Sequence, residues 1–342
     1  MRYLSAARLI WCLAFLLPVV AFASLSVGTV NFSFFQIIET ILLSMGGHSE
    51  PSQIQSIIMD IRLPRIILAL LVGSVLAILG AVMQGLFRDP LADPSLIGVS
   101  GGASVGASIV IVTAGGAMLS PLAGLSMVAL GAFIGGVITT LVVYRVATSI
   151  LGTSVTTMLL AGIAIGAIAG AFNSLLSYFS DNQMLRQISV WQMGNLGEAN
   201  WQKASLMAAV SLIIFSLLPS HAKSLNAFLL GESEARHLGI DVQRIKRQLI
   251  FLTALGVGVS VALAGLIGFV GLVIPHMVRL LIGPDHRALL PASALAGASL
   301  LLIADSIARV VVLPAELPTG ILTALLGAPF FVMLLLKQRG EI

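Results

Sequence analysis

The sequence predicts an all-α membrane protein with about ten transmembrane helices per chain, arranged as one transmembrane domain over residues 1–342. Hydrophobic residues make up 58% of the chain and charged residues only 9%, whereas soluble domains carry about a quarter charged residues. Apolar runs recur along the whole length, and basic residues gather in alternate loops between them. The net charge of +4 follows from this loop bias, so no nucleic-acid partner is expected.

The apolar runs define the individual helices, at about 20 residues for each crossing. They lie near residues 9–29, 64–86, 95–114, 121–143, 154–176, 203–219, 249–269, 270–283, 289–308 and 318–336. The run at 270–283 is short and begins in the stretch GFVGLVIPH, which predicts a kinked helix, a re-entrant helix or one fused to its neighbour. The first run also resembles a secretory signal that ends at Ala21-Phe22-Ala23, and the orientation of the later spans is the same in either case.

The distribution of basic residues predicts that both chain ends are cytoplasmic, because the inner side then holds most of the 18 lysines and arginines. The inner set is Arg2, Arg8, Arg88, Arg145, Lys223, Arg236, Arg244, Lys246, Arg247, Arg279, Arg287, Lys337 and Arg339. The outer set is Arg62, Arg65, Arg186, Lys203 and Arg309. In this orientation the segment 220–248 is the longest cytoplasmic loop, and its residues Glu232 to Gly239 read as a short helix that a glycine ends.

Arg62 and Arg65 stand in the stretch IRLPR on the outer side, against the usual bias. An outer arginine pair held by a proline is a candidate contact for an acidic partner that arrives from outside. The alternative is that Arg62 pairs with Asp60 or with a lipid phosphate.

The sequence offers no enzyme chemistry of its own. None of its four lysines stands in the G-x-x-x-x-G-K-[ST] loop that cradles nucleotide phosphates, so any ATPase must be another chain. Ion coupling would use a carboxylate or histidine within the membrane, and His276 and Asp305 are the candidates. The alternatives are a buried histidine bonded to a freed carbonyl and an i, i+4 ion pair between Asp305 and Arg309.

Two other patterns in the sequence are candidates for sites. Gly98, Gly102 and Gly106 form a small-residue stripe, which predicts close helix packing or, alternatively, a face that lines a pathway. The five histidines are scattered and Cys12 is the sole cysteine, so no metal site and no bound cofactor are expected.

Several long stretches together resemble the FecCD-type permease family of ABC importers for iron-siderophores, haem and vitamin B12. The matching pieces are RLPR at 62–65, GAVMQGLFRDPLADPSLIGVSGGA at 80–103, LLAGIA at 159–164, LLGESEARHLGI at 229–240, VALAGLIGFVGLVIPHMVRL at 261–280, GPDHRALLPASALAGASLLLIAD at 283–305 and ELPTGILTALLGAPFFVMLLL at 316–336. The resemblance implies the vitamin B12-importer-like (type II ABC importer) permease fold in a bacterial inner membrane. It also implies four partners besides lipid: a second copy of the chain, two cytoplasmic ATPase subunits that bind ATP and Mg, and a periplasmic substrate-binding protein.

The same resemblance implies roles for individual residues. Arg62, Arg65 and Arg309 match the arginines that meet glutamates of the binding protein, although Asp305 and Glu316 are near enough in sequence to occupy Arg309. The coupling segment that contacts the ATPase corresponds to Gly231, Glu232, Glu234, Ala235, Arg236, His237, Leu238 and Gly239. The cytoplasmic gate corresponds to Asp89, Leu91, Val155 and Thr156, with a carboxylate at Asp89 where the family often has asparagine.

The resulting hypothesis is the permease of a binding-protein-dependent, ATP-driven importer. The stretch GLFRDPLADPSLIGVS favours haem as the cargo, with ferric siderophore and cobalamin as alternatives. The hypothesis from another class is an ion-coupled secondary transporter, which would need neither an ATPase nor a binding protein.

Overall fold

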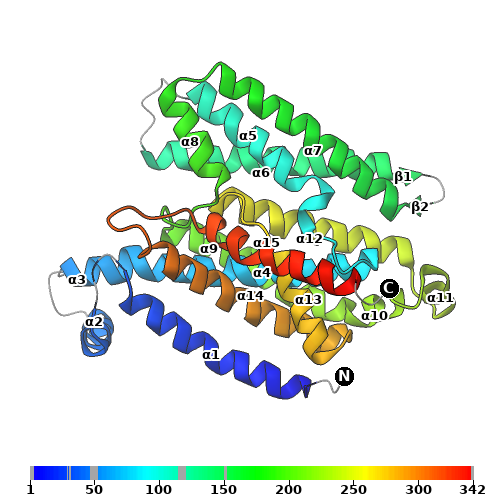
Figure 1. The fold of residues 1–342 in the computed structure, drawn as a ribbon, viewed down its shortest axis with the longest axis horizontal. Helices are drawn as coiled ribbons and strands as arrows, with labels where there is room; N and C mark the ends of the chain where they lie inside the picture. The colour runs from blue at the N-terminus through cyan, green and yellow to red at the C-terminus, as the bar shows by residue number, and fades with distance from the viewer. Residues whose placement is uncertain are drawn as a thin grey trace.

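The computed structural model describes residues 4–28, 30, 32–46, 53–114, 121–149 and 152–339, and these residues form a helical bundle (Figure 1). The helices of the first half are α1 (Ala6–Ser26), α2 (Phe34–Gly46), α3 (Gln53–Ser56), the π-helical turn η1 (Ile57–Arg62), α4 (Leu63–Phe87), the 3₁₀ turn η2 (Pro94–Ile97), α5 (Val99–Ala114), α6 (Pro121–Ala147) and α7 (Val155–Tyr178). Between α6 and α7, strands β1 (Thr148–Ser149) and β2 (Gly152–Thr153) pair antiparallel.

The second half continues the bundle with helices that alternate between long and short. They are α8 (Asn182–Gln192), α9 (Trp201–Leu217), the 3₁₀ turn η3 (Leu218–His221), α10 (Ala222–Phe228), α11 (Glu232–His237), α12 (Val242–Ala264), α13 (Val270–Ile282), α14 (His286–Ala308) and α15 (Thr319–Arg339). Each of the ten predicted spans coincides with one helix, namely α1, α4, α5, α6, α7, α9, α12, α13, α14 and α15. Among the described residues, seven helical stretches are long and apolar enough to cross a membrane, and α5, α13 and α15 are shorter apolar helices.

The span expected at 270–283 is a separate helix. The helix α12 ends at Ala264, and Phe269, immediately before α13, has the left-handed φ of 68°. Pro275 lies inside α13, as the Gly- and Pro-rich pattern indicated. This helix is therefore not fused to its neighbour, and a kinked or a re-entrant helix stays the prediction.

The cytoplasmic loop that the sequence predicts at 220–248 is largely helical. It contains η3, α10 and α11, and α12 begins at Val242, seven residues before the apolar run at 249. The first turns of α12 hold Arg244, Lys246 and Arg247, so a hydropathy pattern places the start of this helix too late. The short helix expected within the loop is present as α11, and Gly239 with its φ of +81° follows its end.

α4 forms the centre of the bundle and packs against α14, α13, α9 and α12. Nearly all of its residues are buried, which explains why this segment carries no charge after Arg65. Gly80 of α4 lies directly against the backbone of Gly271 in α13, so a side chain at either position would separate the two helices.

The predicted glycine stripe on α5 is a packing surface. Gly102 and Gly106 face Gly135 and Gly131 of α6 at backbone contact, which confirms close helix packing for these two residues. Gly98 has a positive φ of +85° and ends the η2 turn.

The two ends of the bundle differ (Figure 1). The first and last described residues lie at one end together with α10 and α11, and α2 and α3 lie at the other. Arg62 ends η1, which follows α3, and Arg65 lies in the first turn of α4, so both are at the end opposite α11. This arrangement has the polarity that the distribution of basic residues predicts.

Candidate docking, coupling and gating sites

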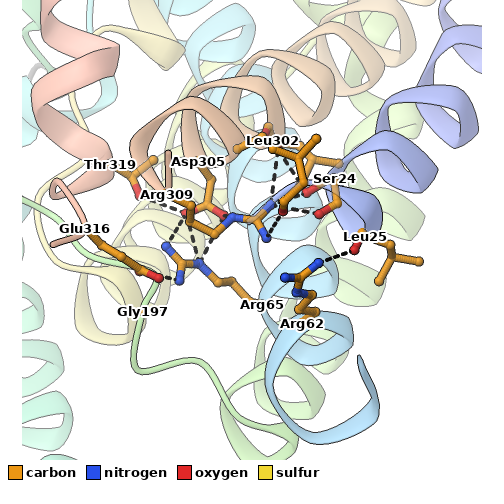
Figure 2. A network of polar contacts seen from close by, with 12 residues as sticks. Ser24, Leu25, Arg62, Arg65, Gly197, Leu302, Asp305, Arg309, Glu316 and Thr319 are labelled. Atoms are coloured by element: carbon orange, nitrogen blue, oxygen red, sulfur yellow. Dashed lines mark hydrogen bonds and ion pairs between the residues drawn. The ribbon is translucent and has the colours of Figure 1, made fainter. Parts of the chain in front are cut away.

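The three predicted docking arginines lie together at the end of the bundle that carries α3 (Figure 2). Arg62 and Arg65 are three residues apart, which puts them on one side of the helix that runs from η1 into α4. Arg309 immediately follows α14, which packs along α4. Helix packing therefore brings Arg309 beside two arginines that lie more than 240 positions earlier in the sequence.

Arg65 is held by two carboxylates. Its Nε and Nη2 donate to Oδ2 and Oδ1 of Asp305, each at 3.0 Å, in the two-pronged geometry that fits a guanidinium to a carboxylate. Its Nη1 donates to Oε2 of Glu316 at 2.7 Å. Asp305 is completely buried and also accepts a hydrogen bond from Thr319, whereas the side chain of Glu316 remains 37% exposed.

Arg309 and Arg62 donate mainly to the end of α1. The last carbonyls of a helix lack partners within the helix, and Arg309 donates to those of Ser24 and Val27 at 3.1 and 3.2 Å. Arg62 donates to the carbonyls of Leu25 and Val30. Its guanidinium also lies 4.6 Å from the centre of the Phe32 ring, within cation–π range.

These contacts bear on the alternatives that the sequence left open. The ion pair expected between Asp305 and Arg309 is present at 3.4 Å, and Arg62 bonds to carbonyls rather than to Asp60. Glu316 pairs with Arg65 and not with Arg309. All three arginines are buried, so contact with a partner requires a rearrangement at this end, and the docking role stays a prediction.

The predicted coupling residues form a compact projection at the opposite end. Gly231, with a φ of 129°, starts α11, and Ala235 is the buried residue that fixes this helix to the bundle. Glu232 is half-buried, and Glu234, Arg236, His237, Leu238 and Gly239 are exposed. A short exposed helix that carries acidic and basic side chains, followed by Leu238 at 63% exposed, is suited to contact another protein.

Asn226 joins α10 to the turn between α13 and α14. Its amide donates to Oδ1 of Asp285 at 2.6 Å, and its Oδ1 accepts from the backbone N–H of His286 at 2.9 Å. The hydrogen bond from Asn226, followed by that from the Arg287 backbone, lowers the pKa of Asp285 below its ordinary value of 3.8. Asn226 therefore ties α10, which precedes the coupling projection, to the start of α14.

The predicted gate residues occupy two turns at the same end as α11. Asp89 accepts a hydrogen bond from the backbone N–H of Leu91 at 2.8 Å and so closes its own turn. Val155 and Thr156 begin α7 directly after the β1–β2 hairpin, and α7 contacts η2 behind the Asp89 turn. An asparagine could accept the same bond, so the carboxylate at 89 does not alter this turn.

A cavity of about 580 Å³ lies between α5 and α7. Serine and glycine residues of both helices line it, together with Asn173, Gln192 and Leu266. Asn173 bridges the helices, donating to Ser104 at 2.9 Å and accepting from Ser108 at 2.7 Å. The described lining residues carry no charge, so this cavity offers hydroxyl and amide groups but no strong ligand.

The two candidates for ion coupling have different surroundings. Asp305 is paired with Arg65 and Arg309. His276 is 9% exposed, and among the described residues its Nδ1 has no hydrogen-bond partner, so the predicted bond to a freed carbonyl is not made by that atom.

The comparisons with known proteins agree on one family. The family model described as the FecCD transport family matches residues 16–337. The chain belongs to this family. It is 45% identical to the hemin transport system permease protein HmuU of Yersinia pestis over 333 residues, covering 96% of this chain and 95% of that protein.

Two further similarities support the membership. The permease is 47% identical over 280 residues to the vitamin B12 import system permease protein BtuC of Escherichia coli, covering 82% of this chain and 83% of that one. A solved structure described as an inward-facing conformation of a metal-chelate type ABC transporter is 34% identical, with a TM-score of 0.84, and the match covers 97% of this chain and 99% of that one. This FecCD permease is thus a helical membrane protein with the fold of ABC importer permeases, as the sequence predicted.

Sequence reasoning missed the residues that connect the sites. Lys246 was assigned only to the inner basic set, but it is 2% exposed and bonds both Glu232 of α11 and the carbonyl of Thr153 in β2. Charge alone predicts a solvated lysine. The one available signal is that Lys246 is the fifth residue of α12. Hydropathy hides this signal, because it places the start of α12 after Lys246.

Proposed function

We propose that this permease is the transmembrane subunit of a binding-protein-dependent ABC importer that moves haem from the periplasm to the cytoplasm. The observation that carries the proposal is the 45% identity to a hemin permease along nearly the full length of both chains. The match to the vitamin B12 permease covers less of the chain at similar identity, so cobalamin is the second candidate. Ferric siderophores belong to the same test.

The importer would consist of two copies of this chain, two ATPase subunits and a periplasmic binding protein in a bacterial inner membrane. ATP and Mg would bind to the ATPases, which would push on α11. The exposed charged surface of α11 supports this contact. At the opposite end, Arg62, Arg65 and Arg309, which lie together in Figure 2, would receive acidic residues of the binding protein after the rearrangement that their burial requires.

The neutral cavity between α5 and α7 is consistent with a passage for a large cargo. Release on the inner side is easiest when the passage holds its cargo weakly. Serine hydroxyls and the Asn173 amide can form hydrogen bonds with a passing carboxylate without trapping it. Affinity for the cargo would then reside in the binding protein, and ATP binding would drive the alternation of access.

The test is uptake into proteoliposomes that contain the permease and its ATPase. Haem, a ferric siderophore and cobalamin are each supplied with their binding protein outside and ATP inside, and an ATPase variant that cannot hydrolyse ATP is the control. We expect haem uptake that requires both ATP and the binding protein. Uptake driven by a proton gradient without ATPase would contradict the importer, and ATP-dependent uptake of cobalamin or siderophore alone would contradict the cargo.

A further inference from the structure

A buried lysine joins the coupling projection to the gate turn. Lys246 lies in the second turn of α12, and its ammonium contacts Oε1 of Glu232 at 2.7 Å and the carbonyl oxygen of Thr153 at 2.9 Å. Glu232 is the first residue of α11, and Thr153 stands two residues before Val155 at the predicted gate. One side chain thus spans two segments that are about 80 residues apart in sequence.

The burial of Lys246 makes both contacts obligatory. An ammonium removed from water needs a counter-charge and hydrogen-bond acceptors, and losing one partner of a buried pair costs about 3–5 kcal/mol. Lys246 is 2% exposed, whereas its partner Glu232 is 29% exposed in its side chain. When α11 moves, the lysine must therefore follow Glu232 or lose its counter-charge.

Two hydrogen bonds hold the gate turn to α12, and both are made by the backbone of Thr153. The backbone N–H of Thr153 donates to Oε1 of Gln243 at 3.0 Å, and its carbonyl accepts from Lys246. Gln243 and Lys246 are three residues apart, so both project from the same side of α12. Gly152, with a φ of +111°, brings the turn against the Gln243 side chain.

The segment bearing Glu232 is built to move as a unit. Two glycines with positive φ, Gly231 and Gly239, bracket α11, and Ala235 is its single buried residue in the described helix. Few apolar contacts oppose a displacement of this helix. The ion pair with Lys246 is therefore a principal link between α11 and the bundle.

We propose that Lys246 is a positioning residue that transmits the displacement of α11 to the gate turn at 152–156. This proposal rests on the proposed function, in which α11 contacts an ATPase and the start of α7 forms the gate. Glu232 moves with α11, Lys246 follows its counter-charge, and the Thr153 carbonyl moves with the lysine. Gln243 keeps the turn attached to α12 throughout, so the loss of Lys246 breaks transmission without releasing the hairpin.

The first test uses the permease by itself and measures hydrogen–deuterium exchange. We expect Glu232→Ala to increase exchange in residues 152–157 as well as in α11, because Lys246 loses its counter-charge. In a Lys246→Met background, Glu232→Ala should add nothing at 152–157, since the link is already absent. A Glu232→Ala effect confined to α11, or one that persists unchanged without Lys246, would overturn the proposal.

The second test measures cargo transported per ATP hydrolysed in the assembled transporter. We expect Lys246→Met to retain ATP hydrolysis and to lower this ratio about five- to tenfold, the size of a typical coupling between sites. Lys246→Arg should preserve the ratio because arginine can also donate to both oxygens. The matched control is Lys203→Met, which breaks the 3.6 Å pair with Glu198 at the other end of the bundle and should leave the ratio unchanged.

The two tests separate the proposal from the function on which it rests. An unchanged ratio in Lys246→Met would overturn the relay while the importer stands. Glu232→Gln serves if Lys246→Met fails to assemble, because Glu232 is partly exposed and its replacement leaves the lysine in place. If the wild-type assembly transports nothing, the proposed function fails, and the exchange measurement still decides whether Lys246 links the two segments.

Discussion

At the scale of single residues, Arg65 is primarily a structural residue of the outer cluster. It neutralises Asp305, which is completely buried, through two hydrogen bonds at 3.0 Å. Its removal leaves that carboxylate with Arg309 at 3.4 Å as its remaining cation among the described residues. A buried charge that loses a close partner is costly, so variants of Arg65 test folding as much as docking.

We therefore expect Arg65→Met to destabilise the permease by about 3–5 kcal/mol. Thermal unfolding in detergent, followed by tryptophan fluorescence, measures this change. The double variant Arg65→Met, Asp305→Leu should recover much of the loss, because it removes the stranded carboxylate as well. Equal stability of wild type and Arg65→Met would show that the buried pair does not form.

Asp89 is a residue whose chemistry in the turn does not depend on its charge. One carboxylate oxygen accepts the Leu91 N–H at 2.8 Å, and an amide oxygen can do the same. We expect Asp89→Asn to keep both the melting temperature and the transport rate. Asp89→Ala should lose about 0.5–1.5 kcal/mol. A transport defect in Asp89→Asn at unchanged stability would indicate that the gate uses the negative charge.

Asp285 gives the permease a defined response to acid. Hydrogen bonds from Asn226 and from the Arg287 backbone lower its pKa in the folded state. A lowered carboxylate pKa contributes stability above the ordinary value of 3.8, and this contribution is lost as the pH falls through the folded-state pKa. We expect wild type to melt above Asp285→Asn at neutral pH, with the difference disappearing in strong acid. A difference that is constant with pH would contradict the assignment.

At the scale of elements, the contact between α4 and α13 depends on Gly80. A side chain there would meet the backbone of Gly271, which cannot yield as a side chain can. We expect Gly80→Ala to lower stability by about 1–3 kcal/mol or more. Gly166→Ala is the matched control, because an added methyl group at Gly166 meets nothing within 4 Å. If the two variants melted alike, the close crossing of α4 and α13 would be wrong.

The helices differ in how well the sequence predicts them. Long uncharged runs such as that of α4 can be found from composition, because every backbone group in a membrane must be bonded within its own helix. The sequence does not predict α2 or α8, because α2 is apolar but has only 13 residues and α8 has 11 residues and is polar. The sequence predicts the start of α12 too late. Its first turns are charged, and hydropathy therefore does not recognise them as part of the same helix.

The site residues also divide into those that the sequence indicates and those that it does not. The family resemblance assigned roles to Arg62 and Arg65, to the coupling segment and to each gate turn, because each of these lies on a short contiguous stretch of sequence, and these roles stay predictions. The partners of those residues were less accessible. Arg65 bonds Glu316, 251 positions away, and Lys246 bonds Thr153, 93 positions away. Only the packing of the helices brings such groups together, and the spacing of residues along the sequence does not predict these contacts.

At the scale of the whole molecule, docking of an acidic partner at the outer cluster must compete with the permease itself. Nε and Nη2 of Arg65 donate to Asp305, which is completely buried, so another protein cannot reach this carboxylate. Its Nη1 bonds Glu316, whose side chain is 37% exposed and lies just before α15. An incoming carboxylate can therefore reach Arg65 at one position, and Glu316 already holds it.

We expect Glu316→Gln to bind the periplasmic partner more tightly than wild type, by up to about tenfold, which corresponds to about 1.4 kcal/mol. The amide keeps the shape of the side chain but gives up the ion pair. Glu198→Gln is the matched control, because it makes the same change in net charge close by, next to Gly197, which Figure 2 shows beside Glu316. Surface plasmon resonance with the permease in nanodiscs measures both. Equal gains in the two variants would mean that general electrostatics governs docking, and a loss of affinity in Glu316→Gln would mean that Glu316 orients Arg65 for its partner instead of competing with it.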